Sequence, residues 1–543
     1  MVVAFLLFVK MDGRARRGRQ VILDGYYQNR QVFCAMRDSV LFRTNNLTRR
    51  AGLSSIGNLI QLAAQLVVNL VVTPIVILGL GRELYGAWTM IQQSVGYLGR
   101  ADLRPMGTLK YLLAAHQYSD DIEEKKRLIG AALLLWMAML PIIIVIGFVL
   151  VWAAPIFIRA SPENRWVVQL SMAIAAINIA LGRLFSLPSN VLGGMNMAYK
   201  AMGLNALMIL LAGSFSAIAI WIGWGLPGVA LSIMLGNLII GGARYLVAKR
   251  ALPWFGVSKP ERDELSGFTM ISGWILLASL GMALITSSDL LLVGIVINPT
   301  AAAVYATTGA VVRMVTTYMQ ELLASISPGI GDLCGRKEFP RLENIRNELT
   351  LVTIGLFAII GAGILALNQS FLGLWVGEGF FAGNLTNLFL VLIGFEIVLV
   401  NTDILIIDGL LQFKSKSITL LVTGITALVI GGILAVKYGM LGVAFGVFIG
   451  RLGFLAFFPA FVSKHTGRSL LDFLRIILRP LLTAGLILSL GYFTSSLIQA
   501  NNWFSFISWG VFIACLSATI MWVVGYQKSD RGLLLRRLSV LFQ

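Results

Sequence analysis

Residues 128–153 read LIGAALLLWMAMLPIIIVIGFVLVWA, a run without a single charged side chain. As a helix rising 1.5 Å per residue, this run would be about 39 Å long, which exceeds the ~30 Å hydrocarbon core of a bilayer. Strands of a membrane barrel need only about 10 residues and alternate apolar with polar side chains, and this run does not alternate. It therefore predicts a membrane-spanning helix.

The whole chain has the composition of a membrane protein. Of its 543 residues, 57% are hydrophobic and only 13% are charged, and the mean hydropathy is +0.84. Soluble domains carry about 25% charged residues. Inside a bilayer only helices and closed barrels satisfy their backbone hydrogen bonds, and long uninterrupted runs favour helices. We therefore predict an all-α integral membrane protein.

Hydropathy places about fourteen spans along the chain. The predicted spans lie near residues 54–80, 84–115, 128–153, 166–191, 203–224, 227–248, 267–297, 300–330, 349–368, 384–412, 417–436, 440–462, 477–498 and 503–525. No connecting loop exceeds about twenty residues. Almost the entire protein is thus expected to lie within the membrane.

The loops on the two sides of the membrane differ in their content of Lys and Arg. If the N-terminal tail is inside, 32 of the 43 Lys and Arg residues fall on that side, and only Arg82, Arg159, Arg165 and Lys437 fall outside. Cytoplasmic loops carry the excess of Lys and Arg, so both termini are predicted to be cytoplasmic in an inner (plasma) membrane. The net charge of +18 then reflects orientation, and no nucleic-acid partner is expected.

An internal repeat divides the chain. Residues 225–239 read GLPGVALSIMLGNLI and residues 439–453 read GMLGVAFGVFIGRLG, an offset of 214 residues. Two six-helix lobes related by a pseudo-two-fold axis along the membrane normal are predicted, with a substrate cavity between them. The predicted units are a basic N-terminal tail (1–52), an N-lobe (53–248), a linker (249–266), a C-lobe (267–462), a final helix pair with its preceding loop (463–526) and a C-terminal tail (527–543).

Basic residues inside the spans are the candidates for substrate binding. A charge within a span costs about 2.5 to 3.5 kcal/mol on insertion scales, so its presence indicates function. The candidates are Arg100, Arg104, Arg183, Arg313 and Arg451. Guanidinium groups bind phosphate bidentately and stay charged, so this set favours an anionic head group.

Acidic residues inside the spans are the candidates for ion coupling through H⁺ or Na⁺. They are Asp289, Glu321, Glu396 and Asp403, of which the last two are seven residues apart on one helix face. A second interpretation stays open for each of them, namely that acids and arginines only pair with one another between helices. Pairing is the favoured interpretation for Arg244 and Asp408.

Catalytic and metal sites are not predicted. The three cysteines, Cys34, Cys334 and Cys515, match no metal or redox spacing, and His116 and His465 lie in predicted loops. The short loops show no nucleophile or phosphate-binding motif, so an enzyme is not expected, although a membrane-embedded glycan enzyme is one alternative. We expect no cofactor.

Several segments resemble a known family. They are LGRELYGAWTMI from Leu80, YLGRADLRPMGTLKYLLA from Tyr97 and the GxxGVA segments at Gly225 and Gly439, in a layout of six, six and two helices. Over roughly residues 53–525 the chain resembles the polysaccharide and oligosaccharide flippases of the multidrug/oligosaccharidyl-lipid/polysaccharide (MOP) exporter superfamily. Family members often carry Gly where this chain has Arg104, which adds a positive charge here.

The resemblance implies a function. Such a protein moves an undecaprenyl-diphosphate-linked oligosaccharide, an O-antigen or exopolysaccharide repeat unit, from the cytoplasmic to the periplasmic leaflet. It implies alternating access through a cationic central cavity, coupling to H⁺ or Na⁺, and a place beside glycan polymerases and glycosyltransferases. The drug-exporting branch of the superfamily, which exchanges cations, is the alternative that this resemblance leaves open.

Overall fold

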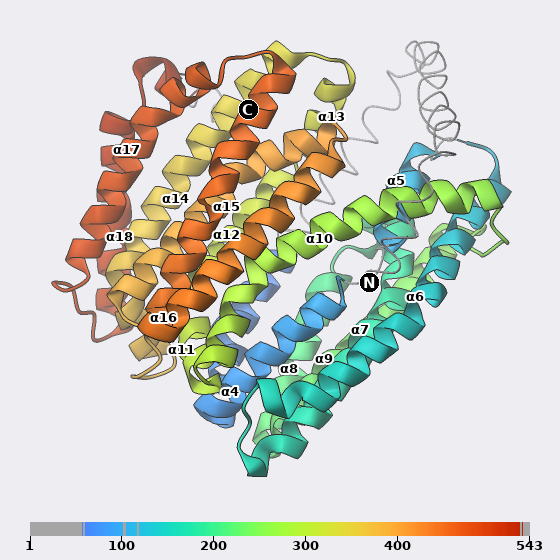
Figure 1. Ribbon diagram of the computed structural model, residues 1–543, viewed down its shortest axis with the longest axis horizontal. Helices are drawn as coiled ribbons and strands as arrows, with labels where there is room; N and C mark the ends of the chain where they lie inside the picture. Colours follow the sequence, from blue (N-terminus) through green and yellow to red (C-terminus); the bar gives the residue numbers. More distant parts are fainter. Residues whose placement is uncertain (1–56, 58–59, 101–104, 117–118, 533–534, 536–543) are drawn as a thin grey trace.

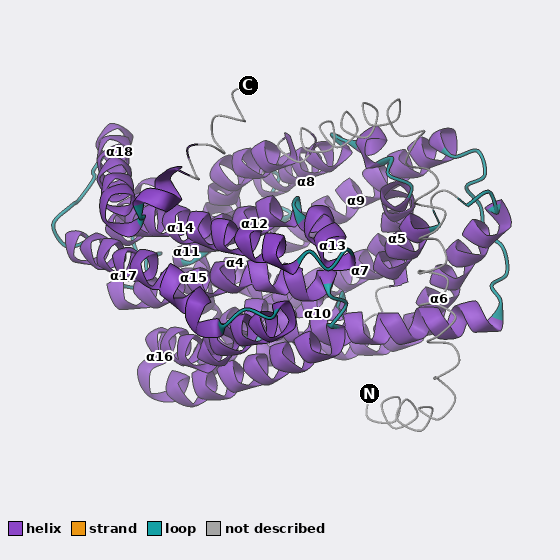
Figure 2. Cartoon of the chain, turned by 90° about the horizontal axis from the view of Figure 1, so that it is seen from above, coloured by secondary structure: helices purple, strands orange, loops and turns teal. Residues whose placement is uncertain are grey.

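The computed structural model describes residues 57, 60–100, 105–116, 119–532 and 535, and within these residues all regular structure is helical (Figure 2). The predicted all-α fold is confirmed. The predicted tail 1–52, Asp102 and Arg104 lie outside the described residues.

The helices follow one another with short connections. The first lobe contains η2 (Val68–Val72), α4 (Thr73–Leu98), α5 (Pro105–Ala115), α6 (Ile122–Phe157), η3 (Pro162–Asn164), α7 (Arg165–Gly194), η4 (Ala198–Ala201), α8 (Leu204–Trp221) and α9 (Gly225–Ala251). The second contains α10 (Arg262–Val296), α11 (Pro299–Thr308), α12 (Ala310–Ala324), α13 (Ser327–Gly335), α14 (Phe339–Trp375), α15 (Asn384–Gly409) and α16 (Phe413–Thr466). The chain then forms α17 (Leu470–Thr494), α18 (Trp503–Ile520) and η5 (Met521–Gly525).

Fewer continuous helices than predicted spans are present, for a physical reason. In the described part of the chain, eleven helical stretches are long and apolar enough to cross a membrane. Two of these stretches leave helical geometry at a glycine with positive φ, Gly81 (φ 72°) and Gly439 (φ 57°), where loops were predicted. The predicted span 84–115 is divided between α4 and α5, and the span 300–330 is divided among α11, α12 and α13. Each predicted span therefore has a helical counterpart.

The internal repeat is present in the backbone geometry. Gly225 and Gly439, which occupy equivalent positions, have φ values of 55° and 57°. Asn196 and Leu411, which follow α7 and α15, have φ values of 53° and 57°. Such left-handed conformations are uncommon for residues other than glycine, so their matched recurrence indicates equivalent turns in the two halves.

Matched close packing accompanies these turns. A methyl group on Gly236 would lie 3.1 Å from Cβ of Ala212, and one on Gly450 would lie 2.3 Å from Cα of Ala427. Small residues let two helices approach closely in a membrane, where helix association depends on packing. The same helix pair is therefore built twice, and more tightly in the second half.

The two helix groups are arranged as a V. In Figure 1, α6 to α9 run along one arm and α14 to α18 along the other. The arms converge where α4 meets α11 and spread apart toward the end that carries α5 and α13. At the convergent end the two lobes are in tight contact, since a methyl group on Gly86 would lie 1.8 Å from the carbonyl oxygen of Pro299.

Two arginines of the first lobe bridge the convergent end. Arg82 donates from Nη2 to the carbonyl oxygen of Glu378 at 2.9 Å and lies 4.9 Å from the ring centre of Phe380. Arg159 donates from Nη1 to the carbonyl oxygen of Ile297 at 3.1 Å. Both carbonyls lie just beyond the C-terminal ends of helices, which attract positive charge. Two of the four basic residues predicted on this side thus form an arginine latch between the lobes.

Gly450 tests the close packing of α16. Gly450→Ala should destabilise the protein by roughly 1 to 3 kcal/mol, because the new methyl group meets the backbone of Ala427. The matched control is Gly453→Ala in the same helix, where a methyl group meets nothing within 4 Å. It should be neutral or stabilising by up to about 1 kcal/mol, since Ala favours a helix over Gly. Thermal unfolding of both variants in detergent checks this, and equal midpoints would contradict it.

The arginine latch predicts a shift in lobe separation. Each hydrogen bond contributes about 1 kcal/mol, so Arg82→Ala combined with Arg159→Ala should change the ratio of closed to open forms at this end about thirtyfold. Spin labels at Glu163 and Asn501, on a background without native cysteines, report the distance across it. Arg165→Ala, which removes an exposed charge from the same end, should leave the distance distribution unchanged. An unaltered distance distribution in the double variant would show that these two hydrogen bonds do not hold the lobes together.

Candidate functional site

Charged side chains gather in the middle of the spans on the second lobe. Arg451 lies about 18 Å along its helix from Gly439, and Glu396 lies about 18 Å from the start of α15 at Asn384. Asp289 belongs to α10, which packs along α16. A bilayer core is about 30 Å thick, so the arginine and Glu396 are placed near its centre.

Arg451, Asp289 and Glu396 form the buried centre of the site. Their exposed fractions are 1%, 8% and 2%. The guanidinium of Arg451 lies within electrostatic range of both carboxylates. Nevertheless Nε and Nη1 of Arg451 and both carboxylate oxygens of Glu396 have no hydrogen-bond partner among the described residues. The attraction between these groups is therefore carried by charge and not by a direct bidentate pair.

Two tyrosines connect this centre to the lobe interface. Tyr305 is fully buried on α11 and donates from its hydroxyl to Asp289 Oδ2 at 3.2 Å. Tyr97 on α4 donates to the carbonyl oxygen of Ala283 at 3.1 Å and hydrogen-bonds the hydroxyl of Ser288. Tyr97 belongs to the first lobe and Ser288 precedes Asp289 directly. The acidic centre therefore lies immediately behind the surface where the lobes meet.

Arg100 and Arg313 lie at the edge of the same cluster. Arg100 is half-buried, and its Nη1 lies 3.5 Å from Thr286 Oγ1 on α10. Tyr97 is within electrostatic range of Arg100 and Arg451, and Tyr305 is within range of Arg313 and Arg451. Three of the five arginines predicted to bind substrate are thus brought into one cluster.

Arg313 also stabilises a broken helix. Between α11 and α12 the helix is interrupted at Gly309, and the guanidinium of Arg313 folds back to donate to the carbonyl oxygen of Ala306. A second carbonyl beside the break, that of Thr308, accepts from Asn368 Nδ2 at 2.9 Å. Freed backbone groups in a membrane need such partners, because unsatisfied ones cost several kcal/mol. The break is therefore a supported feature that holds Arg313 beside the lobe interface.

The cluster has an excess of positive charge. Arg100, Arg313 and Arg451 outnumber Asp289 and Glu396 by one; Arg451 and the two carboxylates are buried, and Arg100 and Arg313 are half-buried. In a buried environment electrostatic interactions are several-fold stronger than in water. The arrangement can attract an anion at the lobe interface, while the carboxylates offer a separate place for a cation or a proton.

Solved structures with the same fold are transporters. The lipid II flippase MurJ, in an inward closed conformation, has a TM-score of 0.62 and 14% identity over 89% of this chain and 99% of its own. An inward-facing multidrug resistance MATE transporter of the MOP superfamily has a TM-score of 0.56 and 15% identity, over 75% of this chain and 98% of its own. The chain has the MOP fold. No protein-family model and no curated protein sequence matches it.

The MOP fold and the eleven apolar helices make this a multi-pass membrane protein. A further structure with this fold, a MOP superfamily transporter from Pyrococcus furiosus, has a TM-score of 0.54 at 15% identity and covers 78% of this chain. That transporter is described as having a binding pocket of reverse polarity. Within the MOP fold, the polarity of the site therefore has to be derived from each chain's own residues.

The remaining predicted residues lie elsewhere. Arg183 is half-buried on α7, and Glu321 is exposed on α12. Arg244 donates to Asn205 on α8, and Asp408 pairs with Lys416 at 2.7 Å. Asp408 thus pairs with a basic side chain, as the pairing interpretation expects, whereas the partner of Arg244 is a neutral amide.

Asp403 belongs to a second buried cluster. Its Oδ1 accepts from Nε of Arg346 at 2.6 Å, and Arg346 also lies 3.3 Å from Glu343. The guanidinium further contacts the hydroxyl of Ser463 and lies 3.8 Å from the ring centre of Phe473. Four helices, α14 to α17, are joined in this way. Asp403 is thereby an ion-pair partner in the structure described here.

Hydropathy and charge do not single out Arg346 and Tyr97. Arg346 precedes the predicted span 349–368 and would fall in a cytoplasmic loop, but α14 already begins at Phe339 and buries the guanidinium completely. The Glu343 and Arg346 pair, three residues apart, is the local signal for such a helix start. Tyr97 carried no charge to single it out, and its contact with Ser288 depends on how the lobes meet.

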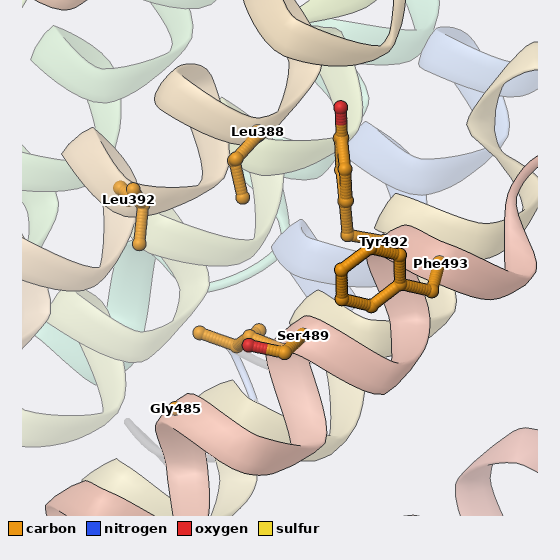
Figure 3. A pocket seen from close by; sticks show the side chains of 7 residues that line it. Leu388, Leu392, Gly485, Ser489, Tyr492 and Phe493 are labelled. Atoms are coloured by element: carbon orange, nitrogen blue, oxygen red, sulfur yellow. The ribbon is translucent and has the colours of Figure 1, made fainter.

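An apolar pocket lies between α15 and α17 (Figure 3). It is lined by Leu388, Leu392, Gly485, Leu488, Ser489, Tyr492 and Phe493. None of these residues belongs to the charged cluster. The pocket is therefore a separate feature on the side of the second lobe.

The Arg346 cluster predicts a loss of stability. Arg346→Ala leaves Asp403 and Glu343 buried without their partner and should cost about 3 to 5 kcal/mol. The matched control is Arg336→Ala, which breaks the exposed pair with Asp332 and should cost about 0.5 kcal/mol or less. Thermal unfolding in detergent measures both. An Arg346 variant as stable as the control would show that the buried pair is not structural.

Proposed function

We propose that the protein is a flippase that moves an undecaprenyl-diphosphate-linked oligosaccharide, an O-antigen or exopolysaccharide repeat unit, from the cytoplasmic to the periplasmic leaflet. The observation that supports this most is the excess of arginine at the lobe interface, formed by Arg100, Arg313 and Arg451 with only two carboxylates. A diphosphate cannot cross hydrocarbon without fixed positive partners, since an isolated charge there costs tens of kcal/mol.

In this proposal Arg100 and Arg313 hold the diphosphate, because they lie at the edge of the cluster and are more exposed than Arg451. Planar guanidinium groups match the phosphate oxygens and keep their charge throughout the cycle. Arg183, on α7 of the first lobe, assists from the cytoplasmic side, and Arg104, which lies outside the described residues, is a further candidate for the diphosphate from its position in the sequence. Arg451, which is buried next to Tyr97 and Tyr305, attracts the diphosphate electrostatically without contacting it.

The arms of the V are consistent with loading from the cytoplasm. With the orientation predicted from the basic loops, the end that carries α5 and α13 faces the cytoplasm. The arms spread toward this end, and the arginine latch joins the lobes at the other end (Figure 1). Release into the periplasmic leaflet then requires the latch to open, as alternating access demands.

Coupling to H⁺ or Na⁺ belongs to the same proposal. Asp289 and Glu396 are the carboxylates closest to the arginine cluster, so a change in their charge alters the attraction for a diphosphate. Glu321 is exposed and Asp403 is held by Arg346, so these two support the coupling role less directly.

A second candidate is a MATE-like exporter that exchanges organic cations for ions. The MATE structures with the same fold and the two buried carboxylates favour it. The charge of the transported molecule separates the two. Transport of cationic dyes, without movement of a lipid-linked diphosphate in the same liposomes, would support the exporter.

The flippase is tested by reconstitution. Purified protein in liposomes should transfer a polyprenyl-diphosphate-linked oligosaccharide between leaflets, as detected by a lectin that reaches only the outer leaflet. Loss of one charged hydrogen-bond donor costs about 1.5 to 3 kcal/mol, so Arg100→Ala and Arg313→Ala should each slow transfer about tenfold or more. Arg313→Lys should be intermediate, because it keeps the charge and loses the planar fork.

Arg244→Ala is the matched control, because Arg244 is an intramembrane arginine that bonds to Asn205 away from the cluster. It should transfer the lipid at the rate of the unmodified protein. Normal transfer by both the Arg100 and Arg313 variants, at equal protein content, would reject the assignment.

A further inference from the structure

The two lobes differ at one equivalent position in their interiors. The repeat aligns Asn237 of α9 with Arg451 of α16. In the first lobe, Nδ2 of Asn237 donates to Oδ1 of Asn178 on α7 at 2.9 Å. α7 corresponds to α15, and the matched turns at Asn196 and Leu411 make Ile393, about one helical turn before Glu396, the equivalent of Asn178. The asparagine at the equivalent position in the first lobe thus has a neutral partner, whereas Arg451 in the second lobe has Glu396 on the neighbouring helix.

The charged version is not a closed ion pair. Arg451 is 1% exposed and Glu396 is 2% exposed, yet neither Glu396 oxygen has a hydrogen-bond partner among the described residues. The same holds for Nε and Nη1 of Arg451. The second carboxylate, Asp289, receives one bond from Tyr305. The arrangement of Arg451 and its two carboxylates therefore differs from that of Arg346, which bonds directly to Asp403 at 2.6 Å.

Two buried carboxylates need a positive charge close by. Taking a carboxylate out of water is costly unless a cation compensates it, and oxygen ligands of this kind suit a small, hard cation. The hydroxyl of Tyr305, a further oxygen, lies 3.2 Å from Asp289 Oδ2. In this lobe, the compensating charge is on a side chain of the protein itself.

We propose that Arg451 is the resident cation of the Asp289 and Glu396 pair and occupies the place where an alkali-metal ion would otherwise bind. The lobe then binds no Na⁺ or Li⁺ as long as Arg451 is present. The assignment needs only the geometry. Its consequence for transport rests on the function proposed above: the coupling ion at Asp289 and Glu396 is narrowed from H⁺ or Na⁺ to H⁺, and transport is independent of a Na⁺ gradient. The N-lobe counterpart, with two asparagines, carries no charge and needs no cation.

The test is binding of the ion alone to the purified protein. Thermal unfolding is followed in NaCl, LiCl and N-methyl-D-glucamine chloride at one ionic strength. The unmodified protein should show the same midpoint in all three salts. Arg451→Asn, which introduces the residue found at the equivalent position of the other lobe, should unfold at a lower temperature and recover several degrees in a saturable way with Na⁺ or Li⁺.

Three controls define the site. Arg451→Lys keeps a cation and should be insensitive to the salt, and so should Arg244→Asn, which removes an arginine that has an asparagine as its partner. Combining Arg451→Asn with Glu396→Gln should abolish the response to Na⁺.

Two results would overturn the assignment. In the first, Na⁺ stabilises the unmodified protein and no longer stabilises the Glu396→Gln variant. This measurement does not depend on whether an Arg451 variant folds. The other is a folded Arg451→Asn protein that is indifferent to Na⁺ and Li⁺. Neither measurement involves lipid transfer. A failed flippase assay therefore rejects the proposed function and not the role of Arg451, and a failed ion-binding test rejects the role of Arg451 and not the proposed function.

Discussion

The cost of placing charge in hydrocarbon is the constraint on which the rest of this structure depends. Every ionised group in the spans has to be compensated by another charge or by bonds, because water is not there to do so. The protein meets this requirement in two ways. Arg346 bonds directly to Asp403 and joins four helices, whereas Arg451 faces Asp289 and Glu396 through electrostatic attraction without full hydrogen bonding. The first arrangement is rigid, and the second leaves charge available at the lobe interface.

Breaks in the helices determine the positions of the charged side chains. Glycines with positive φ at Gly81 and Gly439 separate consecutive spans, and the interruption at Gly309 turns Arg313 back toward α11. The carbonyls freed at that break are bonded by Arg313 and Asn368, which is why the break is tolerated within a membrane.

The two lobes share a backbone and differ in chemistry. Matched turns and matched close packing at Gly236 and Gly450 show the same construction twice. The interior of the first lobe carries the neutral Asn237 and Asn178 pair, and the second carries Arg451, at the position equivalent to Asn237, with Glu396 nearby. The two lobes therefore share a symmetric backbone and differ in charge, and the transport proposed above would use this difference at the surface between them.

The sequence by itself determined the membrane environment, the helical fold, the number and order of spans, and the repeat, because hydropathy and glycine position are local properties of the chain. It also identified Arg100, Arg313, Arg451, Asp289 and Glu396 as candidates, since any charge within an apolar run is conspicuous. Only the tertiary structure decided which of these groups meet. It placed Arg346 inside the protein beside Asp403, brought Tyr97 of one lobe against Ser288 of the other, and directed Arg82 and Arg159 to carbonyls across the lobe interface. These contacts join residues that are far apart along the chain, and they depend on how helices tilt and break, which hydropathy does not encode.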